Sequence, residues 1–255
     1  VQRDDLLPEL RAGGYDGSFV AHTLGTDSMV CVGSGCTRRV PPASTFKIPH
    51  AAIALEVGAL SGPEHPMAWD GEERWVASWN QDHVLRTAIR DSVLWYFMRV
   101  APLVGQARMQ HALDTMGYGN ATIGALDRFW IDGSLLISPV EQVAFWSALA
   151  DGSLPGISAE TRETVLSMCA LARDETSVQS SGTAVLYGKT GWDHRPDSPD
   201  HGWFTGCIDA AGTWTCFALV LETEEASPEL DRFVPARRAA AERLLRHLDI
   251  PVPDH

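Results

Sequence analysis

Two lysines draw attention because Lys47 and Lys189 are the only lysines among the 20 basic residues of the chain. Lysine can lose its proton and act as a base, whereas arginine stays protonated. Lys47 follows Ser44 by three positions, and residues at this spacing lie on the same face of a helix. A serine hydroxyl becomes a good nucleophile when a nearby base takes its proton. Ser44 and Lys47 are therefore a candidate nucleophile and base.

The second lysine stands in the run Lys189-Thr190-Gly191, at the end of a predicted strand. A cation, a hydroxyl and a glycine on an open strand edge can bind a carboxylate group. Each motif is weak when it occurs alone. A Ser-x-x-Lys on a helix followed by a Lys-Thr-Gly on a strand is typical of penicillin-recognising serine enzymes.

The elements that must position these residues are predicted from hydrophobic patterns and turn signals. Helices are expected over residues 4–12, 44–60, 88–100, 106–116, 139–150, 158–172 and 235–248. Strands are expected over residues 18–24, 28–32, 183–188, 202–208 and 213–221. This order predicts a single α+β domain over residues 1–255. Its antiparallel sheet comes from about 1–40 and 183–255, is flanked by helices, and encloses a helical insert over about 44–180. The polar segment 193–201 is expected to be an exposed loop.

The composition indicates a soluble globular protein, with 45% hydrophobic and 21% charged residues. The net charge of -13 disfavours nucleic acid and anionic membrane surfaces as partners, because both carry negative charge. No run reaches the roughly 18 apolar residues that membrane insertion as a helix requires. The sequence also has no CxxC pair and no HExxH motif, so no metal site is expected.

The five cysteines leave two interpretations open. Cys31 and Cys36 bracket a short glycine-rich turn, and Cys207 and Cys216 flank another turn, so either pair could form a disulfide in an oxidising compartment. Alternatively, all five are small buried hydrophobic residues. Cys169 lies in an apolar predicted helix and is expected to be free. The chain starts without a signal peptide, so an exported protein would be present in its processed form.

The sequence resembles the class D serine β-lactamases, the oxacillinase group, from about residue 18 to residue 250. The resemblance rests on several segments at the spacing familiar from that family. They are PPASTFKIPHAAIALEVGAL around Ser44, Trp-Asp-Gly at 69–71, Trp-Asn-Gln-Asp at 79–82, AIRDSVLWY at 88–96, Tyr-Gly-Asn at 118–120, FWIDGSL at 129–135, ISPVEQVAF at 137–145, Lys-Thr-Gly at 189–191 and Gly-Trp-Phe at 202–204. The fold implied is that of the β-lactamases and transpeptidases.

The resemblance implies that Ser44 is the acylated nucleophile. Lys47 would carry CO2 as a carbamate (N6-carboxylysine) and act as general base for acylation and deacylation, so that CO2 or bicarbonate is the only small molecule required besides substrate. An amine must be neutral to capture CO2, so Lys47 needs an apolar pocket that lowers its pKa. Trp130 would donate its indole N–H to the carbamate. Candidate walls of this pocket are Phe46, Val93, Leu94 and Ile131.

Further roles follow from the same resemblance. Ser92 would relay a proton to the departing ring nitrogen, and Lys189 would lie beside it and keep the site positive. The backbone N–H groups of Ser44 and Trp192 would form the oxyanion hole. The substrate is expected to contact Val93, Leu94, Thr190, Gly191, Trp192 and Arg237.

The sequence departs from the family at Leu94, where the family usually has valine. The larger side chain is expected to change the access of water or CO2 to Lys47. Tyr-Gly-Asn at 118–120 is interpreted as a structural corner near the site, with a direct catalytic role as the alternative.

Together these features predict hydrolysis of the β-lactam ring of penicillin-type antibiotics, in the periplasm or in secreted form, with resistance as the consequence. Two alternatives stay open. One is a β-lactam sensor domain of a membrane receptor, which would remain acylated. The other is a cell-wall D,D-peptidase.

Overall fold

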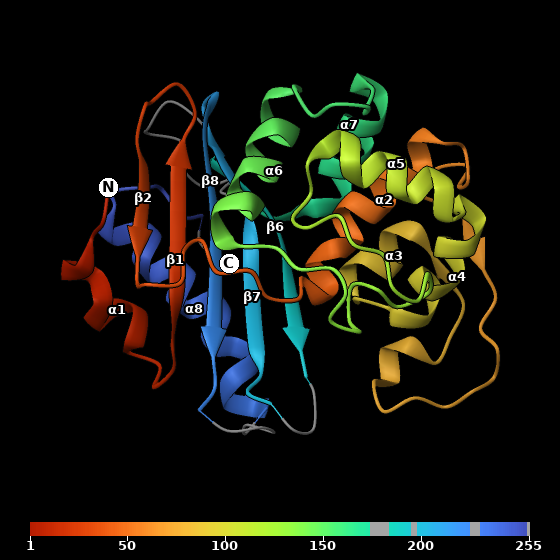
Figure 1. Ribbon diagram of the computed structural model, residues 1–255, viewed down its shortest axis with the longest axis horizontal. Coiled ribbons are helices and arrows are strands. Elements are labelled where there is room, and N and C mark those ends of the chain that lie inside the picture. Colours follow the sequence, from red (N-terminus) through yellow and green to blue (C-terminus); the bar gives the residue numbers. More distant parts are fainter. Residues whose placement is uncertain (174–183, 195–197, 225–229, 254–255) are drawn as a thin grey trace.

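The main sheet joins both ends of the chain. In the computed structural model, which describes residues 1–173, 184–194, 198–224 and 230–253, six antiparallel strands run in the order β2-β1-β8-β7-β6-β5 (Figure 1). The bounds of these strands are β1 (Asp16–Thr23), β2 (Met29–Val32), β5 (Ala170–Arg173), β6 (Ala184–Asp193), β7 (His201–Ala210) and β8 (Thr213–Glu222). Because β1 pairs directly with β8, the predicted α+β sheet built from both terminal segments is confirmed.

Each face of the sheet is covered by helices, and the side chains of the strands alternate between the two faces. On β1, Val20 belongs to the core on the side of the helical region, whereas Phe19 and Ala21 belong to the opposite core. The opposite core is covered by α1 (Leu7–Arg11) and α8 (Leu230–His247), which contact each other and the sheet. Figure 1 shows α6 (Pro139–Asp151) in front of the sheet and α8 behind it.

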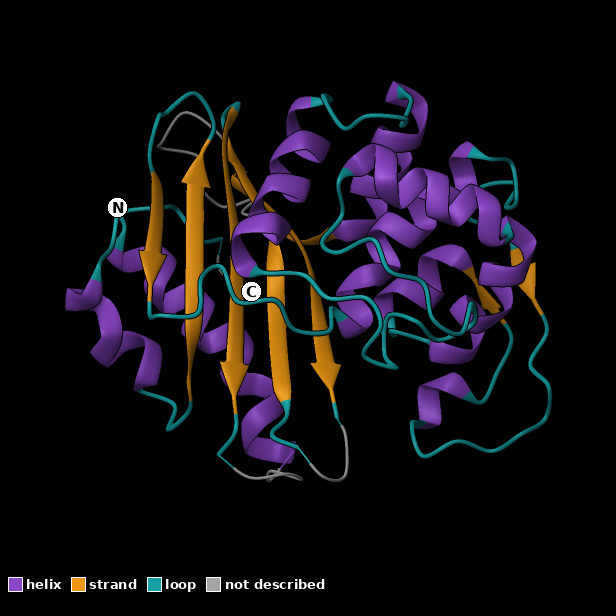
Figure 2. Ribbon diagram, viewed as in Figure 1, coloured by secondary structure: helices purple, strands orange, loops and turns teal. Residues whose placement is uncertain are grey.

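The helical region lies beside β6 and β5 (Figure 2). It contains α2 (Lys47–Glu56), α3 (Leu85–Arg90), α4 (Leu94–Val104), α5 (Gln106–Met116) and α7 (Ala159–Cys169). Short elements complete the fold: 3-10 turns at η1 (Asp4–Leu6), η2 (Ala43–Phe46) and η3 (Ala77–Trp79), and a two-stranded sheet of β3 (Pro66–Met67) and β4 (His83–Val84). The described part of the chain contains no helix that combines the length and the apolar character needed to cross a membrane.

The start of α6 shows how directly the sequence can specify an element. The hydroxyl of Ser138 accepts from the backbone N–H of Glu141, and the Glu141 carboxylate accepts from the backbone N–H of Ser138. Pro139 occupies the first helical position, where its missing N–H costs nothing. This reciprocal capping box is the predicted start of the helix.

Several predicted elements differ from the structure. The segment 193–201, expected to be an exposed loop, begins at the last residue of β6 and ends at the first residue of β7, and its residues Asp193 and Asp200 are buried. The helix expected to reach residue 172 ends at Cys169, because Ala170–Arg173 leaves the helix and pairs with β6 as an edge strand. The strand expected over 183–188 continues to Asp193, so Lys-Thr-Gly lies inside β6 and not at its end; residue 183 falls outside the described residues. The last helix begins at Leu230, five positions before the predicted start at Pro235.

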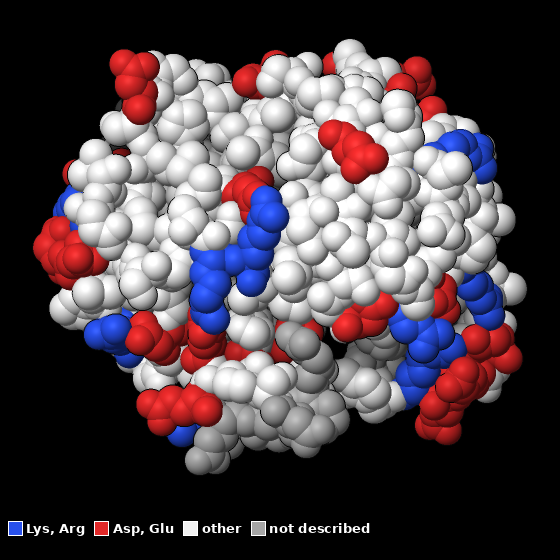
Figure 3. All heavy atoms as spheres, in the orientation of Figure 1, with Lys and Arg blue, Asp and Glu red and all other residues white. Residues whose placement is uncertain are grey.

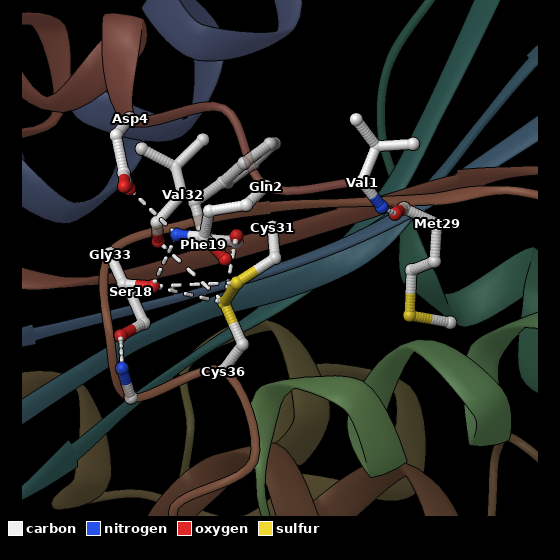
Figure 4. Close-up of a disulfide and its surroundings, with 11 residues drawn as sticks. Val1, Gln2, Asp4, Ser18, Phe19, Met29, Cys31, Val32, Gly33 and Cys36 are labelled. Atoms are coloured by element: carbon white, nitrogen blue, oxygen red, sulfur yellow. Dashed lines mark hydrogen bonds between the residues drawn. A yellow bond between two sulfur atoms is a disulfide. The ribbon is translucent and has the colours of Figure 1, made fainter.

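The structure forms both candidate disulfides, Cys31–Cys36 and Cys207–Cys216. Cys207 and Cys216 are register partners on β7 and β8. Figure 4 shows the Cys31–Cys36 bond beside Gly33 and Ser18, and the Ser18 hydroxyl accepts from the backbone N–H of Gly35 at 2.9 Å. The disulfide and this hydrogen bond hold the segment that follows β2 against β1. Cys169 is free and buried, as predicted.

Charged side chains are dispersed over the surface shown in Figure 3, where small groups of Lys and Arg lie among acidic residues. Ion pairs among the described residues include Arg39 with Glu141 and Arg11 with Asp16. Pairs of this exposed kind contribute little to stability, typically about 0–1 kcal/mol.

Candidate active site

Ser44 and Lys47 meet at the turn that leads into α2. Lys47 Nζ donates a hydrogen bond to Ser44 Oγ at 2.7 Å, as their spacing predicts. The 3-10 turn η2 is fixed by the Thr45 hydroxyl, which donates to the Pro42 carbonyl at 2.7 Å and accepts from Gln142 at 2.8 Å. Ser44 is half-buried, whereas Lys47 is only 1% exposed. The serine therefore faces an opening, and the lysine lies beneath it.

The surroundings of Lys47 are apolar. Phe46, Phe97 and Trp130 are fully buried, and Lys47 Nζ lies 5.6 Å from the centroid of the Phe97 ring. Burial lowers the pKa of Lys47 well below its ordinary value, and the nearby positive charge of Lys189 lowers that pKa further. The neutral amine form of Lys47 is consequently favoured relative to that of an exposed lysine.

Several polar atoms in the same pocket have no hydrogen-bond partner. In the described part of the chain, the buried atoms of this kind include Trp130 Nε1 and both ring nitrogens of His50. The His50 ring packs edge-on against Trp130, with ring centroids 5.2 Å apart. Buried polar groups are nearly always paired in native proteins, so unpaired ones require an explanation.

Ser92 lies in a break between two helices, and the prediction of one uninterrupted helix over 88–100 was wrong at this point. α3 ends at Arg90, α4 begins at Leu94, and Ser92 between them has φ +58°. A non-glycine residue with this conformation costs about 1–3 kcal/mol, and such residues cluster at functional sites. The break presents the Ser92 hydroxyl to Lys189, whose Nζ donates to it at 3.1 Å.

Lys189 lies inside β6 and is 5% exposed. Its Nζ also donates to the carbonyl of Thr190 at 3.0 Å. Burial, and next the charge of Arg237, lower the pKa of Lys189 to about 7. Both protonation states of Lys189 are therefore populated near neutral pH. Its average positive charge is lower than that of the fully protonated lysine expected from the sequence.

Gly191 is required for close contact between β6 and the turn that carries Ser44. A Cβ atom at this position would lie 2.9 Å from the Pro42 carbonyl oxygen and 3.1 Å from Thr45 Cγ2. Arg237, which is buried in the second turn of α8, donates to the Gly191 carbonyl from the other side. The strand is thereby held between η2 and α8.

We expect Gly191→Ala to lower the free energy of unfolding by about 1–3 kcal/mol, because the added methyl forces β6 and η2 apart. Urea denaturation measures this change. Gly13→Ala is the matched control, since its Cβ would meet no atom closer than 3.7 Å. Equal unfolding free energies for the two variants would contradict the close approach of β6 and η2.

A cavity of about 650 Å³ opens over these residues. It collects most of the predicted substrate contacts: Ser44, Ser92, Leu94, Thr190, Gly191, Trp192 and Arg237. Lys47, Trp130 and Lys189 lie buried below this lining. Val93 was predicted to contact substrate, but its side chain is fully buried in the core and is not among the residues that line the cavity. Ile131, expected as a wall of the Lys47 pocket, lines the cavity itself.

The mouth of the cavity has an aromatic wall in which the predicted site residue Trp192 is joined by Trp75, a residue that was not predicted from the sequence. Trp75 is 75% exposed and meets Trp192 edge-on, with ring centroids 6.2 Å apart. Trp192 Nε1 donates to the carboxylate of Asp200 at 2.6 Å, and Asp200 is fully buried. The nine tryptophans of the chain are the sequence signal that could have pointed to this wall.

Tyr-Gly-Asn at 118–120 forms a corner of the backbone. Asn120 Nδ2 donates to the Ser134 carbonyl at 2.8 Å, and Asn120 Oδ1 accepts from the backbone N–H of Leu136 at 2.9 Å. Gly119 has φ +56°. These bonds agree with the structural interpretation of the motif, and its residues do not line the cavity.

Comparisons with known proteins identify the family of this chain. The family model for the penicillin-binding protein transpeptidase domain matches residues 30–240. The chain is 38% identical over 196 residues to the probable β-lactamase YbxI of Bacillus subtilis, which covers 76% of this chain and 69% of that protein. The crystal structure of the class D β-lactamase YbXI from Nostoc superposes with a TM-score of 0.87 at 30% identity, covering 98% of this chain and all of that one.

A receptor domain has the same architecture. The C-terminal domain of the Bacillus licheniformis BlaR penicillin-receptor superposes with a TM-score of 0.87 at 27% identity, and covers 98% of this chain and 97% of that domain. The identity to YbxI is higher and extends over two thirds of its length. With the Ser-Lys pair and the strand motif in place below one cavity, the chain belongs to the class D β-lactamases, a family within the penicillin-binding transpeptidase domains.

Proposed function

We propose that this chain hydrolyses penicillin-type β-lactams through an acyl-enzyme on Ser44, with Lys47 in its carbamylated form as the general base. The observation that carries this proposal is the 2.7 Å contact between Lys47 Nζ and Ser44 Oγ at the floor of the cavity. A carbamylated lysine at this position can place a base next to the hydroxyl that must lose its proton.

The residues around the cavity are proposed to share the steps of acylation. Ser44 Oγ attacks the β-lactam carbonyl, and the backbone N–H groups of Ser44 and Trp192 stabilise the developing oxyanion, with each donor contributing roughly 3 kcal/mol. The ring nitrogen leaves with a proton from Ser92. Lys189, 3.1 Å from the Ser92 hydroxyl, can replace that proton because its pKa is near 7.

The carboxylate of the substrate is proposed to lie along Thr190 and Gly191, opposite the guanidinium of Arg237. Arg237 is 6% exposed, and burial lowers its pKa to about 10, so it stays charged at neutral pH. A carboxylate in this position would also raise the pKa of Lys189. Binding of substrate would thus restore the positive charge that burial weakens.

The pocket of Lys47 fits a carbamate by its own chemistry. Burial favours the neutral amine, the walls of the pocket are apolar, and Trp130 Nε1 is a buried N–H donor with no partner of its own. When present, the carbamate supplies an anionic oxygen base next to Ser44. Trp130 is the residue proposed to hold it.

Location is proposed from the cysteines. Two disulfides are formed among the described residues, and disulfides persist in oxidising environments. We therefore place the protein in the periplasm or outside the cell.

The intact mass of the protein mixed with benzylpenicillin, followed over time, tests the proposal. A transient adduct that disappears as penicillin is consumed supports hydrolysis. The likeness to the BlaR receptor domain makes a permanent adduct the specific alternative, because a sensor stays acylated. Cleavage of a D-alanyl-D-alanine peptide at a higher rate than penicillin would instead identify a D,D-peptidase.

We expect Arg237→Ala to raise KM for carboxylate-bearing β-lactams about 10-fold to 100-fold, because a hydrogen bond to a charged group is worth about 1.5–3 kcal/mol. Steady-state kinetics with benzylpenicillin measures this change. Arg232→Ala is the matched control, since Arg232 lies on the same helix but is exposed. Equal KM values for the two variants would remove Arg237 from the substrate site.

A further inference from the structure

His50 is a buried histidine whose ring has no hydrogen-bond partner. It is fully buried, and neither Nδ1 nor Nε2 has a partner. His83 is 3% exposed, and its ring nitrogens contact the Thr87 hydroxyl at 3.0 Å and the Ser78 carbonyl at 2.8 Å. Leaving a buried polar group without a hydrogen bond is unfavourable. Packing alone does not explain why an imidazole, and not an apolar side chain, fills the position of His50.

The position of His50 links it to Lys47. The two residues are three positions apart on α2, so they share a helix face. The His50 ring lies 5.3 Å from the Phe97 ring, over which Lys47 Nζ lies at 5.6 Å. On its other side the His50 ring packs edge-on against Trp130, whose indole N–H also lacks a partner. Lys47 and the His50 ring thus both lie against Phe97, and the two unpaired rings lie against each other.

The charge states in this pocket favour an anion as the missing partner. Burial and the charge of Lys47 lower the pKa of His50 to about 3, so its ring is neutral and carries one N–H donor. Trp130 contributes a second N–H donor. Two neutral donors without acceptors, beside an amine that can bind CO2, fit a small oxyanion better than they fit a cation or an apolar group.

We propose that His50 is a positioning residue for the carbamate of Lys47, to which its ring N–H donates alongside Trp130. This inference rests on the proposed function, since it assumes that Lys47 captures CO2. It adds that the carbamate has a second donor from the same helix as Lys47. His50 acts through the carbamate and transfers no proton itself.

The experiment measures the carbamate directly, without turnover. Protein in CO2-free buffer is titrated with ¹³C-bicarbonate, and the carbamate carbon is observed by ¹³C NMR. We expect His50→Leu to weaken the apparent affinity for bicarbonate about 10-fold, and His50→Asn, which keeps an N–H donor, to weaken it less. His83→Asn is the control: it removes a buried histidine that is already paired, so the affinity should stay unchanged.

The melting temperature provides a second measurement. In His50→Leu it is expected to stay the same or rise, whereas the affinity for bicarbonate is expected to fall. In CO2-free buffer, His50→Leu removes two unpaired polar atoms from an apolar pocket, so its Tm should equal or exceed that of the wild type. A purely structural histidine would give a lower Tm and an unchanged bicarbonate affinity, which would overturn the inference. If His50→Leu does not fold, His50→Met provides the same comparison, because methionine adapts to irregular pockets.

The two proposals fail in different ways. A carbamate signal in the wild type with equal affinity in His50→Leu or His50→Met would overturn the role of His50 and leave the mechanism standing. Absence of any signal in the wild type at saturating bicarbonate would overturn both. A weakened affinity in the apolar variant that His50→Asn restores in part would support both.

Discussion

Replacing Ser44 with alanine is expected to reduce turnover of nitrocefin by roughly 10⁴-fold to 10⁶-fold, the scale seen when a serine hydrolase loses its nucleophile. The cause is the loss of the oxygen that forms the acyl-enzyme. Initial rates by absorbance measure the loss, and the intact mass after incubation with penicillin should show no adduct. Turnover at the wild-type level would mean that Ser44 is wrongly assigned.

The fold of Ser44→Ala should survive, because the Ser44 hydroxyl has one hydrogen-bond partner, Lys47 Nζ. Losing such a bond changes stability by about 0.5–1.5 kcal/mol, and thermal unfolding followed by circular dichroism measures the change. Ser153→Ala is the matched control, since Ser153 is exposed and lies away from the cavity lining. Its turnover should equal that of the wild type.

The parts of the site that the sequence predicts are those set by local spacing. Ser44 and Lys47 are three residues apart, and the helical backbone alone brings their side chains together. The capping box of Ser138 and Glu141 is likewise contained in four consecutive residues. Antiparallel pairing of the terminal segments follows from the order of strands and helices, because both must bury an apolar face.

Features made by tertiary contact are not predictable in this way. Ser92 breaks a segment whose composition favours a continuous helix, and the φ of +58° is held by the contacts around it. Ala170–Arg173 becomes a strand because β6 offers an unpaired edge. Trp75 and Trp192 are far apart in the sequence and meet only at the mouth of the cavity.

His50 illustrates a third case. Its place in the nucleophile helix was evident from the sequence, but a histidine on an apolar helix face is ordinarily a paired core residue. Only the structure reveals that neither ring nitrogen is paired and that Trp130 next to it is in the same condition. The observation that points to a role for His50 is the absence of hydrogen-bond partners, and no sequence pattern predicts this absence.

Replacing Trp130 with phenylalanine is expected to make turnover strongly dependent on bicarbonate. The substitution keeps most of the packing volume but removes the indole N–H, which would cost the carbamate a hydrogen bond worth about 1.5–3 kcal/mol. That corresponds to a roughly 10-fold to 100-fold lower affinity of Lys47 for CO2. Deacylation should suffer more than acylation, because the carbamate is the base proposed to activate the hydrolytic water.

The effect of added bicarbonate on turnover is expected to depend on pH. Burial lowers the pKa of Lys47, which favours the neutral amine that captures CO2, and this form declines as the pH falls through that lowered pKa. Acid also protonates the carbamate and releases CO2. Added bicarbonate should therefore raise turnover most in degassed buffer at about pH 6 and least at about pH 8.

Turnover rates of the wild type and Trp130→Phe in degassed and bicarbonate-supplemented buffer, at both pH values, test this prediction. Trp146→Phe is the matched control. Trp146 is also a buried tryptophan, but its indole N–H is already bonded to the Thr205 hydroxyl at 2.9 Å. Its replacement should lower stability without changing the response to bicarbonate. If the wild type and Trp130→Phe each gave identical rates in all four conditions, Lys47 would act as an unmodified amine base, and the unpaired N–H of Trp130 would need another partner.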